Sequence, residues 1–102
     1  MKESKETRIS LNQEHARMEY IAFYYFITFP LIAPAVLKKI RKEYIMEPLH
    51  KQIFELLKRY YAANEVYDFQ RIAIDLTKEY NVNHKMFVEH YILISGYAQN
   101  VS

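Results

Sequence analysis

The fold class that the sequence predicts is all-α, with about five helices in a single domain over residues 1–102. Apolar side chains recur with helical spacing along nearly the whole chain. Prolines and asparagines interrupt this pattern at short intervals, as they do at joints between helices. The chain is 51% hydrophobic with a net charge of only +2, so it can build a core and is not expected to be disordered.

The first helix is expected over residues 11–29, with Ser10 as its N-cap and Pro30 as its end. Its second half is rich in β-branched and aromatic residues, so residues 20–29 are compatible with a helix or a strand. A short second helix is expected over residues 34–44, because proline suits a first helical turn. Its apolar stripe comprises Val36, Leu37, Ile40 and Tyr44.

The third helix is expected over residues 48–62, opened by Pro48 and followed by a joint at Asn64. The fourth is expected over residues 65–80, because Asn81 suits the left-handed position that follows a helix. Each has an apolar stripe at helical spacing that predicts its buried face. The stripes are Leu49, Ile53, Leu56, Leu57 and Tyr60 in the third helix, and Val66, Phe69, Ala73, Leu76 and Tyr80 in the fourth.

A weak internal repeat appears when the chain is aligned with itself at an offset of 36 residues. It predicts two helical hairpins, residues 12–44 and 48–80, that stack because neither buries its apolar face alone. A fifth helix over residues 84–95, capped by Asn83 and ended by Gly96, would close the domain. The identical pairs are Glu19 and Glu55, Tyr24 and Tyr60, Tyr25 and Tyr61, Lys42 and Lys78, Glu43 and Glu79, and Tyr44 and Tyr80.

Two adjacent tyrosine pairs indicate a binding surface. In Tyr24-Tyr25 and Tyr60-Tyr61, one ring of each pair must turn away from the stripe that its neighbour joins. Tyrosine is also an ordinary core residue, but outward rings on equivalent surfaces of two hairpins suit an interface. We therefore expect a protein-interaction module that binds a peptide, a protein or a second copy of itself in a groove between the repeats.

An alternative function follows from residues 72–96, which resemble the helix-turn-helix motif of bacterial and archaeal regulators. Thr77, Asn81, Val82, Tyr91 and either Phe87 or Val88 occupy the motif's characteristic places. The resemblance implies that the second helix enters the major groove of DNA. Asn83, His84, Lys85 and Glu89 would then face bases or phosphates.

Charge weighs against DNA binding by that helix. Residues 1–51 carry a charge balance of +3, whereas residues 52–102, which hold the motif, carry −1. Phosphate contacts need several positive charges. The dense basic cluster lies earlier in the chain and reads either as a solvated surface or as a phosphate-binding patch; it comprises Lys38, Lys39, Arg41 and Lys42.

The composition excludes several kinds of chemistry. With one glycine the chain cannot form a phosphate-cradling loop, and with no cysteine it has no disulfide, thiolate metal site or thiol catalyst. No two of its four histidines are three or four residues apart, so no helical metal-ligand pair is present. We therefore expect no enzyme activity, no metal and no cofactor.

A third possibility is a single membrane span, because residues 20–37 carry no formal charge and precede the basic cluster. Pro30 and Pro34 weigh against it, since each removes a backbone hydrogen bond. The charged start of the chain lacks a signal-peptide apolar region, so a cytoplasmic location is expected.

The overall composition resembles that of small orphan proteins of crenarchaeal viruses, especially filamentous ones. Tyrosine, isoleucine and lysine are abundant, glycine is scarce and cysteine is absent. The resemblance implies a hyperthermophilic host, a site inside the host cell, and a role as a DNA-binding regulator or as an interaction protein. Few glycines also fit a thermophile, because they limit the entropy of the unfolded chain.

Overall fold

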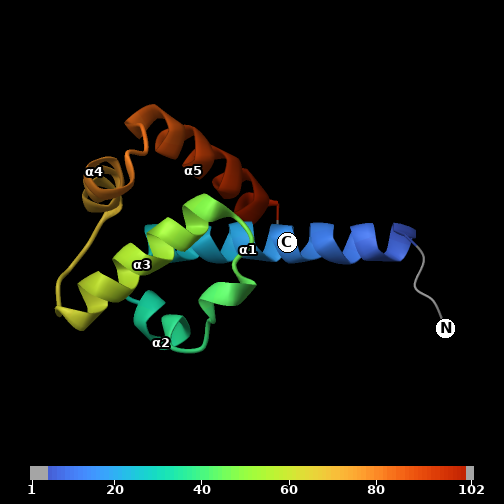
Figure 1. Cartoon of the computed structure of the whole chain (residues 1–102), viewed down its shortest axis with the longest axis horizontal. Coiled ribbons are helices and arrows are strands. Elements are labelled where there is room, and N and C mark those ends of the chain that lie inside the picture. Colours follow the sequence, from blue (N-terminus) through green and yellow to red (C-terminus); the bar gives the residue numbers. More distant parts are fainter. Residues whose placement is uncertain (1–4, 101–102) are drawn as a thin grey trace.

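A computed structural model describes the backbone of residues 5–100 and the side chains of residues 13–100. The all-α prediction is confirmed, and the described residues form helices without a strand (Figure 1). The elements are α1 (Lys5–Thr28), α2 (Ala33–Leu37), a 3-10 turn η1 (Lys42–Tyr44), α3 (Pro48–Ala62), α4 (Phe69–Tyr80) and α5 (His84–Gln99).

Helix α1 is longer than expected at its start, and it includes the ambiguous residues 20–29. Phe23, Phe26 and Ile27 are buried on one side of this segment at helical spacing, which resolves the choice between helix and strand. The prediction of Ser10 as an N-cap is wrong, because the helix begins at Lys5 and continues through that position. Its end before Pro30 is confirmed, since proline disfavours helical backbone in the residue before it.

The predicted helix over residues 34–44 is wrong in its second half. Helix α2 ends at Leu37, and the amide of Lys39 donates to Val36 in a tighter turn. Arg41 is extended before η1 begins, so Tyr44 leaves the predicted stripe and is exposed, and Val36 is exposed as well. The extended backbone that follows η1 leaves the amides of Met46 and Glu47 free to donate to the Glu19 side chain of α1.

Helix α3 has the predicted bounds, and its predicted stripe is buried or half-buried. It ends before Asn64, which is left-handed with φ 56°. Helix α4 begins at Phe69 rather than at residue 65, because the Asp68 side chain accepts from the amide of Arg71 and caps the helix there. Two residues of its predicted stripe, Val66 and Tyr80, are exposed.

The turn between α4 and α5 is confirmed in both of its predicted features. Asn81 is left-handed with φ 56°, and the Asn83 side chain accepts from the amide of Lys85 at 2.7 Å. The prediction that Gly96 ends the last helix is wrong, because α5 continues to Gln99. The final turn is retained because Ala98 is buried against the rest of the domain.

The long α1 packs chiefly on α5, while α3 packs on α2 and α4. The first turns of α1 project beyond the other helices (Figure 1). Residues 12–44 contain most of α1 and the five-residue α2, whereas residues 48–80 contain two full helices. The 36-residue repeat stays a prediction. Among residues 5–100, no helix combines the length and the apolar character that crossing a membrane requires.

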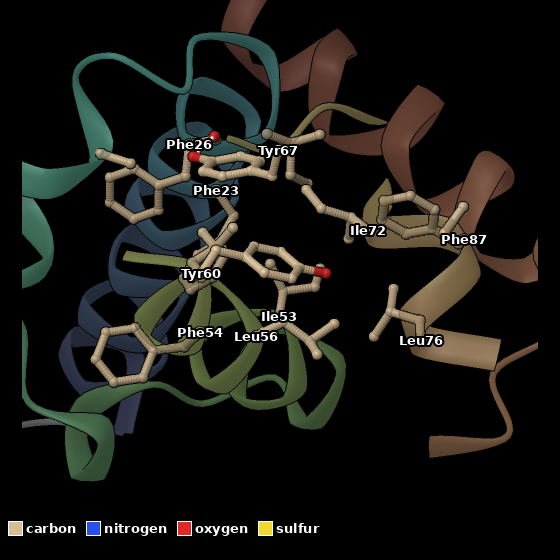
Figure 2. Close-up of a cluster of buried hydrophobic side chains, with 14 of the residues drawn as sticks. Phe23, Phe26, Ile53, Phe54, Leu56, Tyr60, Tyr67, Ile72, Leu76 and Phe87 are labelled. Atoms are coloured by element: carbon tan, nitrogen blue, oxygen red, sulfur yellow. Dashed lines mark hydrogen bonds between the residues drawn. The ribbon is translucent and has the colours of Figure 1, made fainter. Parts of the chain in front are cut away.

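The core lies where α1, α3, α4 and α5 meet (Figure 2). The Tyr67 ring is stacked on Tyr60 at 5.6 Å, and its hydroxyl donates to the carbonyl oxygen of Phe26 at 2.7 Å. That oxygen would ordinarily accept from the amide four residues later, but Pro30 occupies that position and has no N–H. The Tyr67 hydroxyl therefore supplies the donor that proline removes from α1.

Candidate functional site

An apolar pocket of about 230 Å³ opens between α2 and the loop that joins α3 to α4. Its floor includes Ala33, Leu37 and Leu57, which are buried. Two large aliphatic side chains at its edge face solvent, Leu31 at 97% and Val66 at 86% exposure. The full lining comprises Pro30, Leu31, Ala33, Pro34, Leu37, Leu57, Tyr61, Asn64, Glu65, Val66 and Tyr67.

The local sequence explains why these aliphatic side chains point outward. Proline at the end of α1 and in the first turn of α2 forces a tight turn that carries Leu31 on its outside. On the other side, the chain runs without helix before α4, and successive side chains of an extended backbone point in opposite directions. Tyr67 is anchored in the core, where burial raises its pKa to about 12, so Val66 faces solvent.

A second hollow of about 200 Å³ adjoins this pocket and shares Leu37 and Tyr61 with it. We call the two hollows together the Tyr61 groove. Lys38 and Lys58 line the second hollow, with Lys38 Nζ 5.6 Å from the centroid of the Tyr61 ring and Lys58 Nζ 5.3 Å from that of Phe54. In the part of the chain that the structure describes, no salt bridge joins either lysine to a carboxylate.

The four predicted partner-binding tyrosines occupy different environments. Tyr61 is 45% exposed and lines the groove, whereas Tyr60 is buried and donates to Asp75 Oδ2 at 2.6 Å. Tyr24 is half-buried and stacked on Tyr91, while Tyr25 is exposed beside Phe29. In each pair the second ring turns outward, as expected. The structure places Tyr61 alone of the four in the groove lining.

The predicted DNA-contacting residues of the motif lie at the start of α5. Asn83 caps the helix, while His84 and Lys85 are exposed, and Lys85 Nζ is 3.9 Å from a carboxylate oxygen of Glu89. The exposed side of α5 then continues as an apolar surface that includes Ile92 and Leu93. This face therefore combines one lysine with one glutamate and several apolar side chains.

The basic cluster surrounds the turn between α2 and η1, and all four of its side chains are exposed. Lys38 lies over Tyr61, whereas Lys42 forms a 2.9 Å salt bridge with Glu55. Glu55 and Tyr61 are six residues apart on α3, so they lie on different sides of the helix. The remaining members, Lys39 and Arg41, line neither hollow of the groove, and the cluster is divided rather than gathered on one surface.

Sequence reasoning missed a polar chain of three side chains, of which Glu19 and His50 are buried and His90 is half-buried; we call it the buried polar chain. Glu19 Oε2 lies 2.7 Å from His50 Nδ1, and His50 Nε2 lies 2.8 Å from His90 Nε2. The Glu19 carboxylate also accepts from the amides of Met46 at 2.7 Å and Glu47 at 2.9 Å. His50 is fully buried. These bonds link α1, the segment before α3, α3 itself and α5.

Burial lowers the pKa of His50 and is the largest influence on it. The hydrogen bond with Glu19 acts in the opposite direction and raises this pKa. Burial likewise lowers the pKa of His90. Both shifts favour the neutral imidazole, and neither ring lines the Tyr61 groove. The sequence held a signal for the burial of His50, because this residue is three positions from Ile53 on the stripe that α3 buries.

The structure thus contains two features that the sequence did not reveal, the Tyr61 groove and the buried polar chain. The groove offers apolar surface with two lysines at one side, while the polar chain holds three helices together. Comparison of the sequence and structure with protein-family models, curated proteins and solved structures gave no match.

Proposed function

We propose that this chain is a non-enzymatic protein-interaction module that binds a peptide or protein partner in the Tyr61 groove. The observation that supports the proposal most directly is the exposure of Leu31 and Val66 beside an open apolar pocket. Large aliphatic side chains that face water around a hollow are typical of surfaces that bind another molecule.

The position of the groove also supports the proposal. One side of it comes from residues 30–37, which belong to the first predicted hairpin, and the other from residues 57–67, which belong to the second. A leucine-sized side chain that is fully removed from water contributes about 1.5–3 kcal/mol. One or two such anchors in the pocket would supply a large share of the affinity of a typical peptide complex.

The proposal is tested by selecting ligands from a displayed library of random peptides and measuring Kd for the selected peptides. Val66→Asp places a charge beside the pocket and should weaken binding by about tenfold or more. Ile74→Asp is the matched control, because Ile74 is exposed on α4 and lies outside the groove. Selected peptides that bind the two variants equally well would refute the assignment of the groove.

A second candidate function is DNA binding, and the turn between α4 and α5 favours it. Left-handed Asn81 and the Asn83 cap join two helices in a helix-turn-helix order, and the Thr77 hydroxyl donates to the Val82 carbonyl at 2.8 Å. The test is an electrophoretic shift assay at low salt, where phosphate contacts are strongest. A shift that Lys85→Glu abolishes would support this function, and the absence of any shift would dismiss it.

The proposed place of this module is the cytoplasm, or the interior of the host cell if the chain is viral. The lack of cysteine is compatible with that reducing environment. Self-association through the groove is one form of the proposed function, and a sizing column at several protein concentrations distinguishes it from binding to a different partner.

A further inference from the structure

We propose that the partner of the Tyr61 groove is an acidic peptide segment, with an apolar anchor in the pocket and carboxylates on Lys38 and Lys58. This inference rests on the proposed function and specifies the chemistry of its partner. The charges around the groove support the inference. An apolar pocket alone does not distinguish an acidic segment from a neutral or basic one, whereas charged side chains beside it do.

The charges that line the groove are two lysines and one glutamate. Glu65, the acidic residue in the lining, forms a 2.6 Å salt bridge with Arg71, so its charge is already matched. Lys38 and Lys58 form no such bridge in the described part of the chain, whereas Lys42, Arg59 and Arg71 are each paired with a carboxylate. The groove lining therefore keeps two positive charges with no carboxylate partner among the described residues.

The two ammonium groups are also held in place. Lys38 lies over the ring of Tyr61 and Lys58 over the ring of Phe54, and both contacts are within the range of cation–π attraction. Ordering a lysine side chain before binding reduces the entropy lost when it meets a carboxylate. Both lysines line the hollow next to the pocket, so an anchor and an acidic residue on one short segment can reach their sites together.

A phosphate backbone fits this surface less well than a peptide. Phosphate binding draws on several adjacent positive charges, but Lys42 is directed to Glu55 on another side of α3. An apolar hollow occupies the space beside the two free lysines. The observations therefore favour an acidic peptide, and nucleic acid becomes an outcome of the test.

The probes are three fluorescent peptides that share one anchor of a leucine and a phenylalanine one helical turn apart. Their flanking residues are all glutamate, all glutamine or all lysine. With the full chain, the glutamate peptide should bind about fivefold more tightly than the glutamine peptide, as expected for two exposed ion pairs. The lysine peptide should bind more weakly than either.

The decisive variant is the double substitution Lys38→Glu and Lys58→Glu, which should reverse the order so that the lysine peptide binds best. The matched control is Lys78→Glu with Lys85→Glu, which changes the net charge equally at exposed positions of α4 and α5. If the control reverses the order as well, the effect comes from net charge and the inference is overturned.

The remaining outcomes separate this inference from the proposed function. The glutamate and glutamine peptides could bind equally well, with Val66→Asp abolishing the binding of both. That result would overturn the acidic preference and leave the groove as an apolar binding site. If all three peptides fail to bind, the inference is overturned, and peptides selected from the library then show whether the groove binds at all. Displacement of the glutamate peptide by a DNA or RNA oligonucleotide would assign the two lysines to phosphate and overturn the inference.

Discussion

The Nε2 atoms of His50 and His90 lie 2.8 Å apart and join α3 to α5. A contact of this length between two ring nitrogens accommodates a single hydrogen atom. Because His50 Nδ1 faces the Glu19 carboxylate, neutral His50 donates to Glu19 and accepts from His90. Two fully protonated rings would place two N–H groups against each other, so the arrangement requires at least one neutral imidazole.

Stability should fall on mild acidification. Burial lowers the pKa of both histidines in the folded chain from the ordinary value of 6.5. As the pH falls below that value, the unfolded chain binds protons first, so the free energy of unfolding decreases until the folded histidines titrate as well. Chemical denaturation between about pH 7 and about pH 5 measures this, and a level profile would contradict it.

The comparison variant for this profile is His90→Gln. Its side-chain amide can still donate to His50 Nε2, but it cannot take up a proton. The variant should therefore show a shallower dependence of stability on pH than the natural chain. An unchanged slope would mean that His90 does not contribute to it.

Substitution of Glu19 should be among the most destabilising single changes. Its carboxylate accepts from two backbone amides and from His50, all in a buried position. Glu19→Ala leaves these donors without an acceptor and should lower the free energy of unfolding by about 2–4 kcal/mol. Urea denaturation measures the change. Glu14→Ala is the control, because its exposed pair with Arg17 should be worth less than about 1 kcal/mol.

Removal of the Tyr67 hydroxyl should reveal its role at the end of α1. Tyr67→Phe leaves the Phe26 carbonyl without a donor, because Pro30 has no N–H to offer. We expect a loss of about 1–2 kcal/mol in the free energy of unfolding. Tyr25→Phe, at an exposed ring, should change stability by less than about 0.5 kcal/mol, and equal losses in both variants would refute the explanation.

Substitution of Gly96 by alanine should stabilise the chain. Gly96 lies inside α5 with a negative φ, and an added Cβ would meet no described heavy atom within 4 Å. Alanine in a helix is favoured over glycine by about 0.5–1 kcal/mol. A higher thermal midpoint for Gly96→Ala is expected. A lower one would mean that the helix ends at this residue in solution, as the sequence alone suggests.

Polar replacement of the exposed groove residues should affect binding without affecting folding. Leu31 and Val66 bury little surface within the chain, so Leu31→Ser with Val66→Ser should shift the free energy of unfolding by no more than about 1 kcal/mol. The double variant should nevertheless lose the selected peptide ligands. A large loss of stability would assign these side chains to the core instead of to a binding surface.

The helices were predictable where a local signal is strong. Pro48 opens α3, Asn81 adopts the left-handed turn, and Asn83 caps α5, because each depends on the backbone chemistry of one residue. Prediction failed where tertiary contacts compete with helical propensity. Helix α2 ends early and α4 begins late, and the adjoining segments direct Glu47 and Tyr67 toward hydrogen-bond partners in α1.

The candidate site was predictable only in part. Tyr61 was expected on a binding surface, and it lines the groove, but its neighbour Tyr60 is buried. Helical spacing distinguishes the two sides of a helix without showing which side another helix covers. The groove itself depends on where α2 lies against α3, and no local pattern encodes that position.

The sequence by itself determined that this chain is all-α, where α3 begins and ends, where one end of each other helix lies, and which residue types it lacks. Those properties follow from periodicity, from proline and asparagine, and from residue counts. Only the tertiary structure brought Glu19, His50 and His90 together and placed Lys38 beside Lys58. The physical reason is that these pairs lie 20 or more residues apart in the sequence. Their contacts arise from the packing of one helix against another, which periodicity within each helix does not specify.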